Sequence, residues 1–132
     1  DRAQGGLRVF IPHLHFAGAC REAISLYERA FETRAEEVFA DGEKVDHASM
    51  RIHGQLVYLN DRFGNPGFSP QCAVHIILTF ETPESLLNCY EIMRPGSVLI
   101  DPPAELPYTP LAVQFIDRFG VQWGFMVEEA KN

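Results

Sequence analysis

The amino-acid sequence predicts an α+β fold made of two tandem modules, each with the order strand, helix and three strands (βαβββ), whose curved mixed sheets surround a cleft. Strand-like and helical periodicities occur in this order twice along the chain. Like residues also recur about half the chain length apart, namely Phe16 with Phe80, Tyr27 with Tyr90, and Gly54 with Gly120. The chain has 132 residues, of which 46% are hydrophobic, so we expect a single packed domain over residues 1–132.

The first module is expected over about residues 7–61. Its helix is predicted because Ile24, Tyr27 and Phe31 fall on one stripe of a helical repeat. An Asp–Gly pair ending at Gly42 and a His–Gly pair ending at Gly54 indicate tight turns between strands. The helix is expected at residues 19–31, and the strands at 7–16, 34–39, 47–52 and 55–60.

The second module is expected over about residues 72–128, after a linker at 62–71. Thr82 as N-cap and Pro83 as the first helical residue predict where its helix begins. The predicted buried stripe of this helix is Leu86, Leu87, Tyr90 and Met93. The strands are expected at residues 73–80, 97–100, 111–117 and 121–127. Prolines between residues 102 and 110 predict a rigid loop at the mouth of the module, either a connector or a lid.

The composition argues against several classes of protein. The net charge is −7 and no run of basic residues is longer than two, so we expect no nucleic-acid partner. No apolar stretch approaches the roughly 20 residues of a membrane span, so we expect no membrane partner. Three widely spaced cysteines are typical of reduced thiols in a cytoplasmic protein. No signal-peptide pattern is found, and because the chain starts at Asp1, the sequence leaves open whether a leader was removed.

Two histidines near the N-terminus, His13 and His15, raise the question of a site. Residues two apart on a strand point to one face, so both imidazoles should lie opposite Leu14 and Phe16, which pack on the helix. They could bind a metal, line a pocket, or be polar residues on an ordinary sheet surface. By the same alternation, the polar and aromatic lining expected for the cleft is His13, His15, His47, Ser49, Arg51, Tyr58, Asn60, His75, Thr79 and Gln122.

Three segments carry a family resemblance. They are IPHLHFAGACREAISLYERAF (residues 11–31), DHASMRIHGQLVYLND (46–61) and DRFGVQWGFMV (117–127). In this order and spacing, the sequence resembles the PhnB-like branch of the vicinal oxygen chelate superfamily, which has the glyoxalase-like fold of glyoxalase I, bleomycin-resistance proteins and extradiol dioxygenases. The resemblance implies two βαβββ modules and, commonly, a homodimer.

The resemblance also implies where a metal would bind. Metal-dependent members take one ligand from the first strand and one from the last strand of each module. In this sequence those positions hold Ile11, Tyr58, His75 and Gly124. Only His75 is an ordinary ligand, so we expect no cofactor at the usual site, although a divalent metal held by His75 with His13, His15 or His47 stays open.

Two classes of function follow from these residues. The first is a small-molecule binding protein that holds a metabolite or an antibiotic-like molecule in a polar and aromatic cleft without the usual metal. The alternative is a lyase, isomerase or dioxygenase type of enzyme with a rearranged metal site based on histidine, or a metal-free enzyme in which a histidine moves a proton. A shared fold does not name a function, so the sequence leaves open the ligand and whether the protein is catalytic.

Overall fold

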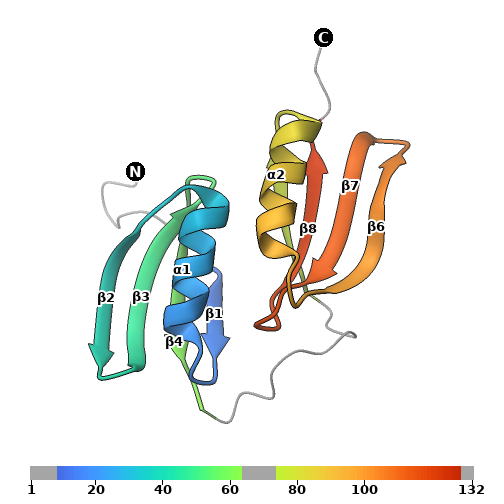
Figure 1. Ribbon diagram of the computed structural model, residues 1–132. Helices are drawn as coiled ribbons and strands as arrows, with labels where there is room; N and C mark the ends of the chain where they lie inside the picture. Colours follow the sequence, from blue (N-terminus) through green and yellow to red (C-terminus); the bar gives the residue numbers. More distant parts are fainter. Residues whose placement is uncertain (1–8, 64–73, 129–132) are drawn as a thin grey trace, which may run out of the picture.

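The computed structural model describes residues 9–63 and 74–128, and it contains two modules of the same topology (Figure 1). The first consists of β1 (His13–Phe16), α1 (Cys20–Phe31), β2 (Ala35–Asp41), β3 (Lys44–Ile52) and β4 (Gln55–Asp61). The second consists of β5 (Ile76–Phe80), α2 (Pro83–Met93), β6 (Val98–Leu106), β7 (Thr109–Ile116) and β8 (Gln122–Val127). The predicted α+β fold of two βαβββ modules is confirmed.

Each module forms one four-stranded mixed sheet with its helix on one face. The strand orders are β1-β4-β3-β2 and β5-β8-β7-β6, so the two orders are equivalent. In each sheet the first strand runs parallel to the last, and the other pairs are antiparallel. The modules lie side by side, so within one chain the two sheets do not close around a cavity (Figure 1).

The repeated residues occupy equivalent places in the two modules. Phe16 and Phe80 are the last residues of β1 and β5. Gly54 and Gly120 both precede the last strand of their module, and both have a positive φ, 80° and 97° respectively. A left-handed backbone conformation of this kind favours glycine, which explains why the residue recurs there.

Several boundaries of the strands differ from the sequence predictions. The first strand begins only at His13, although the Pro12 carbonyl still accepts a hydrogen bond from the Tyr58 amide. The proline-rich stretch is not a loop, because Pro102 and Pro103 lie in β6, an edge strand that pairs irregularly with β7. Proline is tolerated on an edge strand, where its missing amide hydrogen costs no ladder bond. Most of the predicted linker and the start of the predicted strand at 73–80 lie outside the described residues.

Different side chains bind the free backbone amides at the N-termini of the two helices. In α1 the side chain of Asp61, at the end of β4, accepts hydrogen bonds from the amides of Gly18 and Cys20. In α2 the Thr82 side chain accepts from the Ser85 amide, as the predicted N-cap does. The helices have 12 and 11 residues, and the described part of the chain holds no helix that could cross a membrane.

The buried stripe of α2 departs from its prediction at one position. Leu86, Tyr90 and Met93 are buried, whereas Leu87 is 39% exposed. Cys89 takes the remaining place in the core. The helical repeat of the sequence allows either Leu87 or Cys89 in the buried stripe. In the structure, the face of α2 that packs against the sheet is the one that holds Cys89.

A buried carboxylate joins the two modules. Asp117, between β7 and β8, accepts hydrogen bonds from the Tyr27 hydroxyl of α1 at 2.6 Å and from the Trp123 indole of β8 at 2.8 Å. The ring of Trp123 also packs against Phe31 of α1, with centroids 5.3 Å apart. Trp123 is 1% exposed. Residues of both modules therefore share one hydrophobic core.

Candidate ligand-binding site

A cavity of about 560 Å³ lies on the open face of the second sheet. Its lining comes only from the second module, namely His75, Ile77, Asp101, Pro102, Ala104, Leu106, Tyr108, Ala112, Val113, Gln114, Gly124, Phe125 and Met126. Most of these side chains are apolar, and a few polar groups lie among them. This volume and this mixture are typical of sites for small organic molecules.

The alternation of β5 explains which of its residues line the cavity. Leu78 and Phe80 are buried on the helix side, and Ile76 packs partly against the same core. Ile77 and the preceding His75 are exposed on the opposite side. His75 thus lies on the open face, as its sequence position predicts.

The polar centre of the cavity is formed by His75 and Gln114. The Gln114 amide nitrogen lies 3.3 Å from Nε2 and 3.4 Å from Nδ1 of the imidazole. Both distances are longer than the usual 2.9–3.0 Å of a strong hydrogen bond. The two side chains are therefore loosely paired, and both can donate to or accept from a ligand.

The remaining polar groups come from β6 and from the hairpin that joins it to β7. Asp101 supplies a carboxylate and Tyr108 supplies a phenol, and both side chains are exposed. Among the described residues, no lysine or arginine lines this cavity. The electrostatic character is thus acidic, which favours a neutral or cationic ligand over an anionic one.

Gly124 sets the depth of the cavity. A Cβ atom at this position would lie 2.8 Å from Cδ1 of Ile77 and 3.5 Å from Nε2 of His75. The Ile77 side chain thus fills the space that a longer residue at position 124 would need. The floor of the cavity is apolar as a result.

The positions that would hold the superfamily's metal do not fit one here. Ile11 and Gly124 have no donor atom in their side chains, and Ile77 blocks the space beside Gly124. Among residues 9–63 and 74–128, no group of three or more His, Cys, Asp or Glu side chains could hold a metal ion. The donor set is therefore too poor for the octahedral site that the resemblance implies.

The predicted site residues of the first module form a separate cluster on the open face of the first sheet. The His13 and His15 rings lie 4.3 Å apart, and the Tyr58 ring lies 4.7 Å from the His47 ring. The Nδ1 atom of His15 lies 2.7 Å from the side-chain oxygen of Asn60. These five residues belong to one sheet, whereas His75 belongs to the other.

The His13 imidazole is held near its neutral form. Burial lowers its pKa, and the neighbouring His15, His47 and Arg62 lower the pKa further. A neutral imidazole of this kind can accept a hydrogen bond as well as donate one. His13 can therefore offer hydrogen bonds to a ligand from the open face of the first sheet.

Four other predicted site residues remain, and the structure places each of them differently. Ser49 is buried in β3, opposite Tyr58 in the ladder. The Arg51 side chain forms an ion pair with Glu36 at 3.4 Å on the surface, and it also donates a hydrogen bond to the Gly54 carbonyl. Gln122 is half-buried, and its Oε1 atom has no hydrogen-bond partner among the described residues. Thr79 is exposed and does not line the larger cavity.

Sequence reasoning missed Asp101, Tyr108 and Gln114. Tyr108 lies in the stretch interpreted as a proline-rich loop, and Asp101 lies between that stretch and the predicted strand at 97–100, whereas the structure forms the β6–β7 hairpin there. Gln114 lies in a strand that was predicted, between the buried residues Val113 and Phe115. Alternation along this strand points to Gln114, so this signal was present in the sequence.

Comparison with known proteins agrees with this architecture. No family model matches the sequence, and a search of curated proteins finds no match either. Among solved structures, the PhnB protein from Bacillus cereus is similar over 91% of this chain and 99% of its own, with 21% identity and a TM-score of 0.80. A glyoxylase/bleomycin resistance protein/dioxygenase domain from Frankia sp. EAN1pec has 17% identity and a TM-score of 0.69, with coverage of 93% and 98%.

The fosfomycin resistance protein FosX from Listeria monocytogenes also matches, with 10% identity, a TM-score of 0.69, and coverage of 93% of this chain and 94% of its own. Identities of this size show a shared fold and no more. The chain has the glyoxalase-like fold, as the sequence resemblance predicts.

Proposed function

We propose that this protein binds a small organic molecule on the open face of its second sheet, without a metal at the superfamily's usual positions. The observation that supports this proposal is the cavity of about 560 Å³ with an apolar lining and a loosely paired His75 and Gln114. Polar groups that are only weakly bonded to each other can exchange that contact for bonds to a ligand.

The charge of the cavity narrows the class of ligand. Asp101 is the one carboxylate among the described residues that line it, and the whole chain carries a net charge of −7. A dianion such as fosfomycin would meet repulsion from both. A neutral or cationic molecule with a flat apolar part suits the lining better. The name of bleomycin stands in the description of the Frankia domain. This molecule is too large to enter the cavity whole, but its flat aromatic tail with a cationic end can enter, so it serves as a probe.

A second copy of the chain is proposed to cover the open faces of the two sheets. Exposed apolar side chains on these faces support this arrangement, since Ile77 is 49% exposed and Phe39, which stacks on His47, is 58% exposed. Covering such side chains would contribute to the stability of a homodimer. Light scattering coupled to gel filtration measures the mass in solution, and a monomer at micromolar concentration would contradict this part of the proposal.

The binding proposal is tested by titrating metal-free bleomycin and fosfomycin into the labelled protein and following backbone amide resonances. We expect bleomycin to shift the signals of Gln114 and Met126, and fosfomycin to leave them unchanged. Ala112→Trp should fill the cavity and weaken bleomycin binding by about tenfold or more. Ala40→Trp is the matched control on the first sheet, because Ala40 is exposed in β2 and should leave binding unchanged.

Two results would overturn the proposal. One is bleomycin binding that is equally strong in the wild-type protein and in the Ala112→Trp variant. The other is the lack of any shift at the cavity with bleomycin and with a library of neutral and cationic ring fragments. Gln114→Leu provides a second variant that removes the polar centre and adds little volume, in case Ala112→Trp alters the fold.

A further inference from the structure

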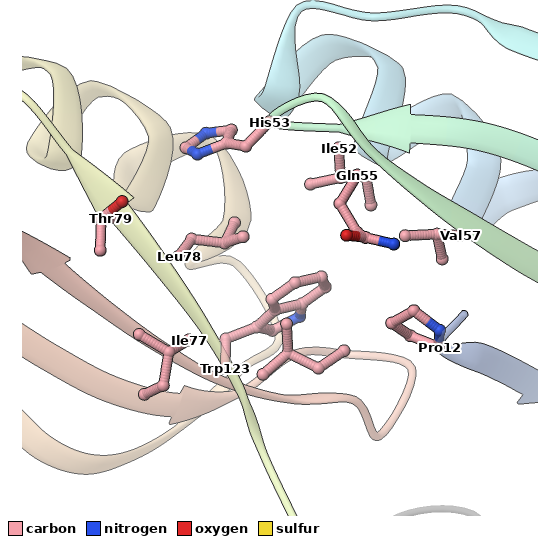
Figure 2. A pocket seen from close by; sticks show the side chains of 10 residues that line it. Pro12, Ile52, His53, Gln55, Val57, Ile77, Leu78, Thr79 and Trp123 are labelled. Carbon is pink, nitrogen blue, oxygen red and sulfur yellow. The ribbon is translucent and has the colours of Figure 1, made fainter. Parts of the chain in front are cut away.

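A second cavity, of about 290 Å³, lies between the two modules (Figure 2). Its lining comes from both modules, namely Pro12, Ile52, His53, Gln55, Val57, Ile76, Ile77, Leu78, Thr79 and Trp123. Only Ile77 is shared with the cavity on the second sheet. The two spaces are therefore distinct, and nothing in the proposed function uses the space between the modules.

The short first strand explains why this space exists. β1 pairs with β4 only from Tyr58 onward, because β1 begins at His13. The start of β4, from Gln55 to Val57, consequently has no neighbouring strand on that side. β5 is also an edge strand, and its residues line the opposite wall. The gap between the two sheet edges is thus built into the topology.

The amide of Gln55 is held in one orientation. Its nitrogen donates to the Phe10 carbonyl and to the Leu56 carbonyl, each at 3.0 Å. These two acceptors fix which end of the amide is nitrogen, because a flipped amide would set its oxygen against both carbonyl oxygens. The oxygen points across the gap toward the second module (Figure 2). Among the described residues, Gln55 Oε1 accepts no hydrogen bond, so it can accept one from a ligand.

The Trp123 indole forms an apolar wall of the cavity. Its N–H group is already committed to Asp117 at 2.8 Å, so the ring offers the cavity only carbon surface. Ile52, Val57 and Leu78 add further apolar surface, and each is buried. The site therefore combines one oriented acceptor with an apolar lining, beside the polar side chains of His53 and Thr79. Trp123 is also the only tryptophan of the chain, which makes it a specific reporter for this cavity.

We propose that the cavity between the modules is a second binding site, which takes a small neutral aromatic molecule carrying one O–H or N–H donor. The donor bonds to Gln55 Oε1, and the ring lies against Trp123. A cavity of about 150 Å³ is already sufficient for benzene, so the volume here holds a single substituted ring. A carboxylate or phosphate is disfavoured, because Gln55 presents an acceptor and the described residues that line the cavity include no arginine or lysine.

The test compares 4-iodophenol with 4-iodoanisole, whose O-methyl group removes the donor. Iodine quenches tryptophan emission on contact, so a saturable loss of Trp123 emission reports binding in this cavity. We expect 4-iodophenol to bind roughly threefold to tenfold more tightly than 4-iodoanisole, as one hydrogen bond predicts. Gln55→Leu should abolish this preference.

Gln114→Leu is the matched control, because it makes the same substitution in the other cavity and should leave the preference intact. Circular dichroism and the emission maximum of Trp123 check that each variant is folded. Equal affinities for the two probes, or a preference that persists in Gln55→Leu, would overturn the proposal. A linear, non-saturable loss of emission would overturn it as well, because it would indicate collisional quenching without a site.

Discussion

Replacing Asp117 by alanine should destabilise the protein more than any other single change of a polar side chain that we propose. The carboxylate accepts bonds from the Tyr27 hydroxyl, the Trp123 indole, and the backbone amides of Phe119 and Val121. Tyr27 is fully buried, and burial and Asp117 raise the pKa of its hydroxyl well above its ordinary value, so it remains a donor at neutral pH. Without Asp117, both buried side-chain donors would lose their acceptor.

The magnitude follows from the burial of these donors. A buried donor left unpaired costs about 1–3 kcal/mol, and two of them are the Tyr27 hydroxyl and the Trp123 indole. The amides of Phe119 and Val121 are half-buried and can bond to water, so they add less. We expect Asp117→Ala to lower the free energy of unfolding by about 3–6 kcal/mol, a large share of the 5–15 kcal/mol typical of a domain.

Urea denaturation followed by far-ultraviolet circular dichroism measures this change. Tyr27→Phe should cost about 1–2 kcal/mol alone and much less in the Asp117→Ala background, because the acceptor is already absent there. Asp46→Ala is the control, since Asp46 pairs only with Lys44 on the surface and should cost about 1 kcal/mol at most. A cost below about 1 kcal/mol for Asp117→Ala, or strictly additive effects with Tyr27→Phe, would refute the reasoning.

Three further predictions concern stability and reactivity. Thr82→Ala should lower the free energy of unfolding by about 1 kcal/mol through loss of the N-cap, and no change in urea denaturation would contradict this. Burial is the largest cause that lowers the pKa of His13 and of His53 in the folded protein below 6.5. As the pH drops below 6.5, the unfolded chain therefore binds protons at these histidines before the folded protein does. The free energy of unfolding should fall with pH in that range. The double variant His13→Gln with His53→Asn should show a smaller fall in urea denaturation, and an equal fall would refute the assignment. Burial raises the pKa of the Cys20 and Cys89 thiols to about 12, so iodoacetamide should label them, as read by peptide mass spectrometry, only at the rate of unfolding.

The sequence predicted the fold well because each module repeats strong local signals. Thr82 and Pro83 define the start of α2, and the glycines at 54 and 120 allow the left-handed turns before β4 and β8. The alternation in β1 and β5 also predicted which side chains face the helices, such as Phe16 and Phe80. These features depend on near neighbours in the chain, so periodicity and turn chemistry detect them.

The candidate site could be predicted only in part, because it depends on contacts between distant strands. His75 was identified from its position in the sequence. Its partner Gln114 lies in β7, and the two side chains come together because β8 is the one strand between β5 and β7 in the sheet. Asp101 was missed because prolines indicate a loop unless the edge position of β6 is known. The gap beside Gln55 depends on where β1 begins, and strand boundaries are weakly encoded in local sequence.

The central claim, that a small molecule binds the open face of the second sheet without the superfamily's metal, is tested most directly by isothermal titration of the protein with metal-free bleomycin in excess EDTA. We predict saturable binding at one site per chain that Ala112→Trp weakens by about tenfold or more and Ala40→Trp leaves unchanged. Binding that disappears in EDTA, or that the two variants affect equally, would contradict the account.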